Sequence, residues 1–356
     1  MKVALLGAGR IGTTIAQWLH NNKFEVTVAD SSQKALNPLR NVGIQTQTVN
    51  VNNQSELITF LKPHDAAINA LPYSAAVTTA KACASSGTHY FDLTEDVAAT
   101  RSIQELAKTT KKVAFMPQCG LAPGFIGIAA HNLASSFDTL DEVKMRVGAL
   151  PQYPNNELKY NMTWSPEGLI NEYIQPCDAI RSGKQTSIAA LADLENLVIN
   201  GVEYEAFNTS GGIGTLFESL KGKVRNMDYK SIRYPGHLEK IRFLMHDLRL
   251  QEDTEILHKI LANAIPSTKQ DVVIVFVAVS GWINGLYEQK ILTRTIKAST
   301  NETAIQIATT SGICAVIDLF REGKLPSEGF IGQEKVCLQE FLENRFGAAY
   351  NQSLAQ

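Results

Sequence analysis

Short apolar runs and amphipathic segments alternate along the first 120 residues of the chain. Strands are predicted from the β-rich runs at 3–6, 24–29, 44–51, 66–70, 89–93 and 113–116. Helices are predicted from the segments at 13–21, 31–41, 55–61, 75–86 and 100–110. Strands separated by helices of this length are typical of a parallel sheet with helices on both faces, an α/β architecture of the Rossmann type.

The pattern changes from about residue 121. Residues 142–148 predict a strand, and 164–173 predict a helix whose Ser-Pro-Glu start suits an N-cap and first turn. The alternating stretches 271–281 and 286–298 predict a hairpin that turns near 282–285. We therefore expect a second α/β domain built on a mixed sheet. Two further helices are predicted at 302–320 and 333–346. The expected domains are 1–122, 123–300 and a C-terminal helical segment, 301–356, that packs back on the first domain.

The first loop carries a glycine pattern with a physical meaning. Gly7, Gly9 and Gly12 have G-x-G-x-x-G spacing directly after a predicted strand and before a predicted helix. Gly7 allows a tight turn, Gly9 lets the backbone approach a pyrophosphate, and Gly12 lets the helix pack close to the strand. Arg10 and Ile11 complete the loop, and the N-terminus of the following helix favours negative charge.

The second predicted strand ends in Asp30, 18 residues after Gly12. A carboxylate there accepts hydrogen bonds from ribose hydroxyls and repels a 2′-phosphate, so the sequence predicts NAD rather than NADP. Ligands of such sheets bind at the carboxyl ends of the strands, which places 7–12, Asp30, 69–73, 93–96 and 118–124 around one crevice. The further residues expected to contact the cofactor are Asn69, Ala70, Leu71, Pro72, Leu93 and Gly120.

Composition excludes several function classes. The net charge is −2 without a basic block, which disfavours nucleic acid as a partner. The longest apolar run, 272–279, is far shorter than the roughly 20 residues that span a bilayer, so no membrane association is expected. The five cysteines are scattered without a C-x-x-C pair, which favours the cytoplasm. His89 and Asp92 would lie on opposite faces of a strand, so no metal site is predicted there.

Five motifs resemble one family throughout the chain. They are NALPY at 69–73, CGLAPGF at 119–125, TWSPEGLINEY at 163–173, SGGIGTL at 210–216 and RYPGH at 233–237. Through these motifs the chain resembles the saccharopine dehydrogenase-like family, and most closely its lysine 6-dehydrogenase branch. The resemblance implies a Rossmann domain, an inserted substrate domain, C-terminal helices that rejoin the first domain, and a homodimer. It also implies oxidation of an amino acid's C–N bond with hydride passing to a nicotinamide. In the lysine branch, the ε-carbon is deaminated to allysine, which cyclises to piperideine-6-carboxylate.

Two departures from the family pattern bear on the substrate and cofactor. The reductases carry G-L-D-P-G where this chain has Ala122 in the third position, so any role of that acidic residue is missing. The reductases also end the second strand with a neutral or basic pair suited to NADP, where this chain has Asp30. Both differences favour a free amino acid and NAD over saccharopine.

Candidate catalytic residues follow from the chemistry of amine oxidation, which needs a proton acceptor and a positioned substrate. Tyr73, just past a strand end, is a candidate proton relay, or a ring that packs against the adenine. His237 is a candidate proton acceptor because histidine titrates near neutrality, or a satisfied structural residue. Cys119 is a candidate contact of the nicotinamide, or a small buried hydrophobe.

Candidate substrate-binding residues lie in the second domain. Arg233 offers a planar fork for a carboxylate, and its alternative is a structural salt bridge. The matching arginine of family members favours substrate binding. Trp164 and Ser165 are expected to face the crevice, although Trp164 could equally be core and Ser165 only a helix cap.

Two other functions stay open. A saccharopine-type (opine) dehydrogenase would need a second carboxylate-binding group, for which the sequence offers Lys159, Arg225 and Lys230. A non-catalytic NAD sensor would bind NAD without turnover.

Overall fold

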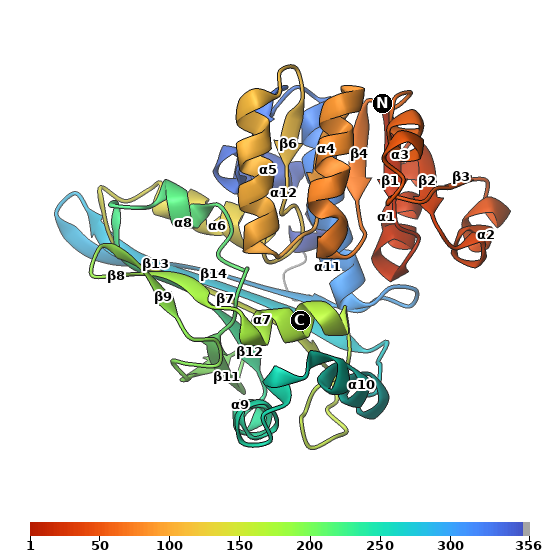
Figure 1. The fold of residues 1–356 in the computed structure, drawn as a ribbon. Coiled ribbons are helices and arrows are strands. Elements are labelled where there is room, and N and C mark those ends of the chain that lie inside the picture. Colours follow the sequence, from red (N-terminus) through yellow and green to blue (C-terminus); the bar gives the residue numbers. More distant parts are fainter. Residues whose placement is uncertain (352–356) are drawn as a thin grey trace. The chain divides into compact units, whose positions relative to one another are not determined.

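The described residues form two compact units. The computed structural model describes residues 1–351. The first unit comprises Met1–Phe125 and Thr309–Ala349, and the second comprises Ile126–Ala308 together with the described residues from 350 onward (Figure 1). The C-terminal segment therefore returns to the first unit after the second has been completed.

The first unit is built on a parallel seven-stranded sheet with the order β15-β6-β5-β4-β1-β2-β3. β1 pairs with both β2 and β4, so the strand order reverses at β1, which is where sheets of this kind bind ligands. The strands are β1 (Lys2–Leu6), β2 (Glu25–Asp30), β3 (Gln45–Thr48), β4 (Ala66–Asn69), β5 (His89–Asp92), β6 (Ala114–Met116) and β15 (Gly329–Phe330).

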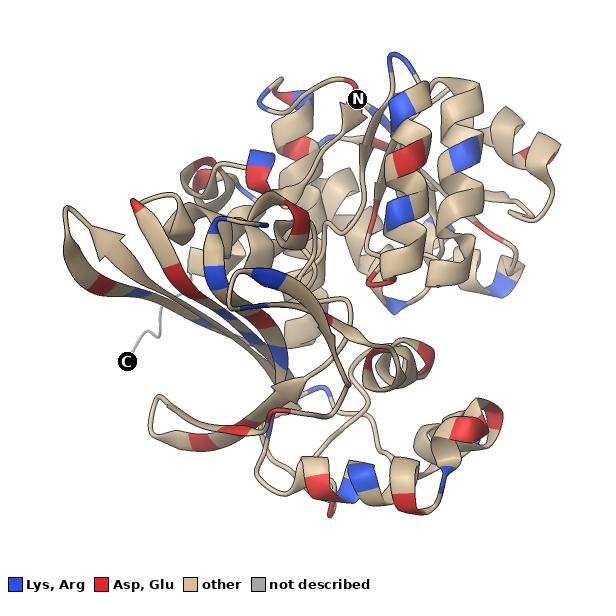
Figure 2. Cartoon of the chain, turned by 60° about the vertical axis from the view of Figure 1, so that its left-hand side comes forward, with Lys and Arg blue, Asp and Glu red and all other residues tan. Residues whose placement is uncertain are grey.

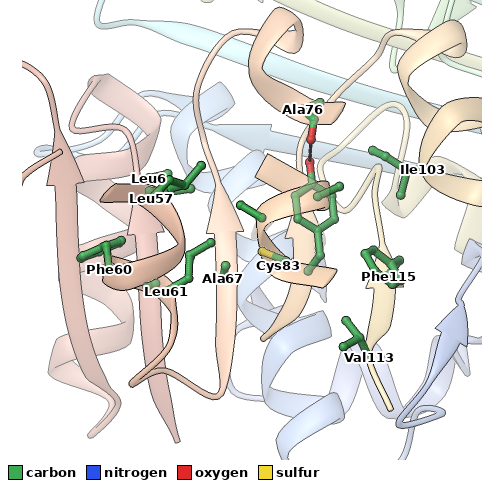
Figure 3. Packing of buried hydrophobic residues seen from close by; sticks show 14 of the residues in the cluster. Leu6, Leu57, Phe60, Leu61, Ala67, Ala76, Cys83, Ile103, Val113 and Phe115 are labelled. Atoms are coloured by element: carbon green, nitrogen blue, oxygen red, sulfur yellow. Dashed lines mark hydrogen bonds between the residues drawn. The ribbon is translucent and has the colours of Figure 1, made fainter. Parts of the chain in front are cut away.

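Helices of the first unit bury their apolar sides against this sheet (Figure 3). They are α1 (Arg10–Asn21), α2 (Gln33–Asn41), α3 (Gln54–Leu61), α4 (Ala76–Ser86), α5 (Val97–Thr109), α12 (Leu338–Glu343) and the C-terminal part of α11 (Ala304–Arg321). Side chains from α3, α4 and α5 meet strand residues in one cluster, which includes Leu57, Phe60, Cys83 and Ile103 against Leu6, Ala67 and Phe115. Three short 3₁₀ helices, η1 (Tyr73–Ala75), η4 (Gln333–Lys335) and η5 (Gly347–Asn351), complete the described part of this region.

The second unit is built on a mixed eight-stranded sheet. The main order is β10-β11-β12-β7-β13-β14, and β8 and β9 join at β12; β7 and β12 run parallel and the other pairs are antiparallel. The strands are β7 (Thr139–Pro151), β8 (Cys177–Arg181), β9 (Lys184–Ile188), β10 (Glu195–Ile199), β11 (Val202–Asn208), β12 (Val224–Arg233), β13 (Asp271–Ile283) and β14 (Leu286–Lys297).

Its helices are α6 (Phe125–Ala134), α7 (Pro166–Ile174), α8 (Leu216–Ser219), α9 (His237–Arg242), α10 (Thr254–Ala264) and the first part of α11, with a π-helical turn, η2 (Phe243–Asp247), and the 3₁₀ turn η3 (Leu250–Glu252). α7, α9 and α10 share a core with Phe207 of β11. A separate apolar cluster consists of strand residues alone, among them Leu150, Tyr204 and Ile232. Asn200, in the turn after β10, donates to the Thr295 hydroxyl of β14 at 3.4 Å. Because β10 and β14 are the two edge strands of the main order, this contact brings opposite edges of the sheet together, so the sheet is strongly curved.

Opposite charges are interspersed over both units (Figure 2), and one buried group of them lies on the second sheet. Arg146 of β7 donates to Asp228 at 2.6 Å and to Glu195 at 2.9 Å, and Lys230 also contacts Glu195 at 2.9 Å. Each charge of this group has a hydrogen-bonded partner of opposite sign, which is the condition for tolerating charges in the interior.

The sequence predictions for the fold class and for most elements are confirmed. The hairpin β13–β14 turns at Asn284-Gly285, and both residues have positive φ, as such turns require. The predicted helix at 333–346 is wrong: only η4 and α12 form there. The side chain of Gln333 donates to Gln118 O at 3.0 Å, and Asn344 leaves helical geometry to donate to Asp318 at 3.0 Å. α11 is long and apolar enough to cross a membrane, but 72% of it is buried, as in the core helix of a soluble protein.

Candidate functional site

The carboxyl ends of the parallel strands are linked by short backbone hydrogen bonds. Gly7 N donates to Ala29 O, and Ala70 N donates to Leu6 O, both at 2.8 Å. Cys119 N donates to Asp92 O at 2.9 Å. The loops after β1, β2, β4, β5 and β6 therefore lie along one edge of the sheet, which is the edge where the sequence places a cofactor.

The three glycines of the first loop meet different surroundings. Gly7 has φ +104°, and a Cβ there would lie 2.8 Å from Ala70 O. A Cβ on Gly12 would lie 2.0 Å from Gly7 O, so helix α1 packs directly against the turn. A Cβ on Gly9 would meet no atom within 4 Å. Gly7 and Gly12 are thus required by the fold, whereas the space beside Gly9 is open for a bound pyrophosphate.

Asp30 ends β2 with its carboxylate held by two backbone donors. Ala8 N donates to Oδ2, and Ser32 N donates to Oδ1, each at 2.8 Å. The carboxylate therefore fixes the glycine-rich loop and stands where a ribose would bind. Together with the open space at Gly9 and the N-terminus of α1 at Arg10 and Ile11, this arrangement fits a dinucleotide.

The other predicted cofactor-binding residues lie at the same edge. Asn69 ends β4, and its Oδ1 accepts from Leu71 N at 3.3 Å, which stabilises the loop that contains Ala70 and Pro72. Leu93 follows β5 and lies 3.5 Å from the position of a Cβ on Gly120.

Sequence reasoning missed the role of Asp92 in this edge. Its Oδ1 accepts from Gln118 N at 2.8 Å and from Thr94 N at 3.0 Å, and the Tyr90 hydroxyl lies 2.6 Å from Oδ2. Asp92 therefore ties the loop after β6 to the loop after β5. Burial raises the pKa of its carboxyl to about 6, although these hydrogen bonds act in the opposite direction. Gln118 has φ +65°, a rare conformation for a residue with a side chain, which this tether holds in place.

Glu95 is a second carboxyl at this edge that the sequence analysis did not select. It follows Thr94 in the loop after β5 and is half-buried. Burial raises its pKa to about 7, and the nearby Asp96 and Asp92 add to the shift. Apart from its own backbone N–H, its side chain has no hydrogen-bond or ion-pair partner among residues 1–351. A carboxyl with a pKa near neutrality is suited to accept and return a proton.

Two predicted catalytic residues of the first unit have different surroundings. Tyr73 begins η1 directly after the Asn69–Pro72 loop and is half-buried at the cofactor edge. Cys119 is buried, and its Sγ donates to Met116 O at 3.1 Å. Burial raises the pKa of Cys119 well above its usual range, so its thiol stays protonated. Cys119 is therefore no reactive thiolate, whereas its contact with a nicotinamide stays a prediction.

Arg233 lies at the centre of a buried aromatic cluster in the second unit. It ends β12, and its Nε donates to the Tyr173 hydroxyl at 3.0 Å while Nη1 donates to Ile232 O at 2.9 Å. The guanidinium carbon lies 5.0 Å from the centroid of the Tyr160 ring and 5.8 Å from that of Tyr173. No salt bridge to Arg233 forms within the described residues, and its Nη2 has no hydrogen-bond partner there. The predicted alternative of a structural salt bridge is therefore not what the structure shows.

His237 belongs to the same cluster, but not as the predicted proton acceptor. Its Nδ1 lies 2.8 Å from Leu158 O, which only accepts, so Nδ1 carries the proton. Nε2 then accepts from the Tyr173 hydroxyl at 3.1 Å. Burial, aided by the charge of Arg233, lowers the pKa of His237 to about 3. The expected titration near neutrality is wrong: His237 stays neutral and orients Tyr173, which in turn orients Arg233.

Other polar atoms of this cluster also lack partners within the described residues. Tyr160 Oη and Thr163 Oγ1 are buried close to each other, and neither forms a hydrogen bond of standard geometry there. Buried polar groups are nearly always hydrogen-bonded, so these two hydroxyls beside Arg233 are candidates to bind a polar ligand. Trp164, next in sequence, is half-buried and packs on the same core. Ser165 caps α7: its hydroxyl accepts from Gly168 N at 3.2 Å and donates to Glu167 Oε2 at 3.3 Å.

The three candidates for a second carboxylate-binding group are engaged elsewhere. Lys159 donates to Pro235 O at 3.0 Å, and Arg225 lies 3.6 Å from Asp141. Lys230 is paired with Glu195, and because it lies three residues before Arg233 on the same strand, it faces the opposite side of the sheet. In the part of the chain that the structure describes, no three His, Cys, Asp or Glu side chains are grouped as metal ligands.

Comparison with known families assigns both parts of the chain. The model of the saccharopine dehydrogenase NADP binding domain matches residues 3–116. The model of the saccharopine dehydrogenase C-terminal domain matches residues 120–344. The second match alone covers more than half of the chain.

Similar proteins agree with this assignment. The mitochondrial alpha-aminoadipic semialdehyde synthase of Rattus norvegicus is 25% identical over 64% of this chain, and the match covers 27% of that protein. The saccharopine dehydrogenase [NADP(+), L-glutamate-forming] of Pyricularia oryzae is 24% identical over 52% of this chain and 43% of its own length. This chain thus spans less than half of the length of either relative.

A solved structure shows the same fold over nearly the whole chain. The apo saccharopine dehydrogenase (L-Glu forming) from Saccharomyces cerevisiae superposes with a TM-score of 0.77 at 16% identity and covers 96% of each chain. The glycine-rich edge, the mixed second sheet and both domain matches therefore lead to one conclusion: the chain belongs to the saccharopine dehydrogenase family, with an NAD(P)-binding domain at its N-terminus.

Proposed function

We propose that this protein is an NAD-dependent amino-acid dehydrogenase that oxidises a C–N bond, and that its reaction is the oxidative deamination of lysine at the ε-carbon. The observation that carries the proposal is the buried guanidinium of Arg233, which has an unused donor and no acidic partner in a salt bridge among the described residues. The nearby buried Glu172 favours the charge of Arg233 but forms no salt bridge with it within the described residues, so the guanidinium can still pair directly with a carboxylate of a ligand.

The substrate carboxylate is the group that fits Arg233. Nε and Nη1 already donate within the protein, so Nη2 is left to donate to a carboxylate, and the neighbouring Tyr160 and Thr163 hydroxyls can add further hydrogen bonds. Tyr173 holds the guanidinium through its hydroxyl, and His237 in turn orients that hydroxyl. An amino acid bound in this way keeps its side chain free for the reaction.

The reaction also needs a group that removes a proton from the substrate ammonium. Glu95 has the pKa for this role in the first unit, since burial brings the pKa to about 7. An ionised carboxylate with this pKa can take one proton from an ammonium group, and the neutral amine that remains can lose hydride from the adjacent carbon. When bound, the nicotinamide accepts that hydride. Water then hydrolyses the resulting iminium to an aldehyde and ammonium.

Asp30 supports NAD as the preferred cofactor. Its carboxylate is held by Ala8 N and Ser32 N and stays at the end of β2, where a 2′-phosphate would meet a negative charge.

A saccharopine-type substrate is the second candidate, favoured by the names of the relatives. Such a substrate brings a further carboxylate, and the three basic residues considered for it are engaged in other contacts. This observation favours a substrate with one carboxylate, which is a free amino acid.

A substrate and cofactor screen tests the proposed reaction. NAD reduction is measured with lysine, ornithine, other amino acids and saccharopine, and then with NADP in place of NAD. We expect turnover with lysine and NAD, with higher activity at alkaline pH because the ε-amine has a pKa of about 10.4 in water. Turnover with saccharopine alone would support the second candidate, and NAD binding without turnover of any substrate would support a sensor.

The variant Arg233→Lys tests the residue that carries the proposal. It keeps the charge but loses the fork, so KM for the amino acid should rise at least about tenfold with a smaller change in kcat. Arg181→Lys is the matched control, because Arg181 pairs with Asp228 on the other side of the sheet, and its KM should equal that of the wild type. An unchanged KM in Arg233→Lys would remove Arg233 from the binding site.

A further inference from the structure

Strand β14 leaves an apolar edge exposed on the second sheet. It is the last strand in the order β10-β11-β12-β7-β13-β14, and no further strand pairs with it within residues 1–351. Leu286 is 68% exposed, Tyr287 55% and Ile291 54%. Natural proteins rarely leave a long edge strand with apolar residues uncovered, because its free N–H and C=O groups pair readily with another strand.

The exposed residues are confined to the first half of β14. In the second half, Asn200 of the β10–β11 turn donates to the Thr295 hydroxyl at 3.4 Å, so part of the chain already lies beside that position. The edge that is free for pairing therefore runs from 286 to about 292. On one face of this segment, Tyr287 stacks edge-on against Trp282 of β13 with ring centroids 5.0 Å apart.

This segment is complementary to itself when read in the antiparallel direction. A two-fold axis at Gln289 places Leu286 opposite Leu292, Tyr287 opposite Ile291, and Glu288 opposite Lys290 of a second copy. Directly opposite residues in an antiparallel pair point to the same face and contact each other. Apart from Gln289, which meets its own copy once on the axis, every pair in this register joins two apolar side chains or two opposite charges, and each of these pairs occurs twice.

Neighbouring registers lack this complementarity. An axis at Glu288 or at Lys290 brings two like charges together, which destabilises a strand pair. An axis at Ile291 would bring Tyr287 against Thr295, where Asn200 already lies. Lys290 is also held in position, with Nζ 2.8 Å from Ser136 Oγ and 5.5 Å from the centroid of the Phe137 ring. The Lys290 ammonium thus stays on the sheet face to which Glu288 of the second copy would also point.

We infer that a second copy of this chain pairs with β14 through residues 286–292, in an antiparallel register centred on Gln289. The two curved sheets then join into one continuous sheet, and Tyr287 and Trp282 of each copy pack against Ile291 of the other. The inference rests on the edge itself and holds whichever substrate the enzyme takes.

Charge exchange across the axis tests this register. The variants Glu288→Lys and Lys290→Glu each place like charges opposite one another twice, and the double variant restores both pairs. Molar mass is measured by light scattering after size-exclusion chromatography over a range of protein concentrations. We expect a dimer for the wild type and the double variant, and at least about tenfold weaker dimerisation for each single variant. Far-ultraviolet circular dichroism confirms that all variants are folded.

A disulfide at the axis gives a second, independent readout. Opposite Cα atoms in an antiparallel pair lie about 4.5–5.5 Å apart, within the range that a disulfide bridges. Gln289→Cys should therefore form a covalent dimer on mild oxidation, whereas Ile291→Cys should form much less. Val198→Lys on the other edge strand, where Val198 is 70% exposed, is the matched control and should leave the dimer intact. A monomeric wild type, single variants that dimerise like the wild type, or a dimer lost only in Val198→Lys would overturn the inference.

Discussion

Gly9 and Gly12 of the first loop give a prediction in which the smaller of two substitutions destabilises the fold more. Gly12→Ala adds one carbon at a point 2.0 Å from Gly7 O, where the obstacle is backbone and cannot rotate away. Gly9→Val adds three carbons at a point with no atom within 4 Å, and Gly9 has φ −72° and ψ −172°, which any residue adopts. The fold should therefore tolerate Gly9→Val and resist Gly12→Ala.

The magnitudes follow from these surroundings. Overpacking against backbone costs about 3 kcal/mol, and alanine returns about 1 kcal/mol of helix propensity, so Gly12→Ala should lower the free energy of unfolding by about 2 kcal/mol. At roughly 2–4 °C per kcal/mol for a protein of this size, Tm should fall by about 4–8 °C. Gly9→Val should cost under about 1 kcal/mol, the usual loss when a poor N-cap residue replaces a better one.

Cofactor binding should show a different pattern. The valine side chain of Gly9→Val occupies the space beside the loop where a pyrophosphate binds, so NAD affinity should fall below detection while the fold persists. Thermal unfolding is followed by circular dichroism, and NAD binding by calorimetric titration of the same samples. Wild-type NAD affinity in Gly9→Val would place the dinucleotide elsewhere, and a wild-type Tm in Gly12→Ala would show that the close approach to Gly7 O is not needed.

Four further predictions concern single side chains. Asp30→Ala should weaken NAD much more than NADP, because it removes ribose hydrogen bonds and the repulsion of a 2′-phosphate; equal losses in a titration would refute this role. With Glu95 as the proposed proton acceptor, kcat/KM should rise with pH through a limb near 7 that Glu95→Gln abolishes and His237→Asn retains; the reverse result would return the role to His237. Because the pKa of His237 is lower in the folded state, the unfolded chain binds a proton there more readily. Its contribution to stability is therefore present above pH 6.5 and is lost as pH falls towards 3, so His237→Asn should flatten the acid limb of a denaturation profile. Cys119→Ser should leave kcat within about twofold, because the thiol is buried and protonated, and a loss of a hundredfold would restore a chemical role.

Local patterns predicted the elements whose formation depends on neighbouring residues. The strand, glycine loop and helix at 2–21 could be predicted because turn, N-terminus and helix are specified by adjacent positions. The hairpin at 271–297 could be predicted from its alternation and its Asn284-Gly285 turn. By contrast, the segment 333–346 has a helical pattern, but Gln333 and Asn344 are drawn into contacts with Gln118 and Asp318, far away in sequence.

The candidate site divides in the same way. The cofactor edge could be predicted because each strand end is encoded locally, and parallel sheets bring those ends together. The protonation of His237 could not, since its pKa depends on burial among Tyr173, Leu158 and Arg233. The raised pKa of Glu95 could not be read from the sequence either, because a carboxyl in a loop is usually exposed to solvent.

The origin of the released ammonia tests the proposed reaction most directly. Lysine labelled with ¹⁵N at either the α- or the ε-nitrogen is incubated with the enzyme and NAD, and the ammonium is analysed by mass spectrometry. The proposed binding of the α-carboxylate by Arg233 predicts label only from the ε-nitrogen, with one NADH formed per ammonium. Label from the α-nitrogen, or NAD reduction without ammonium, would contradict oxidation at the ε-carbon.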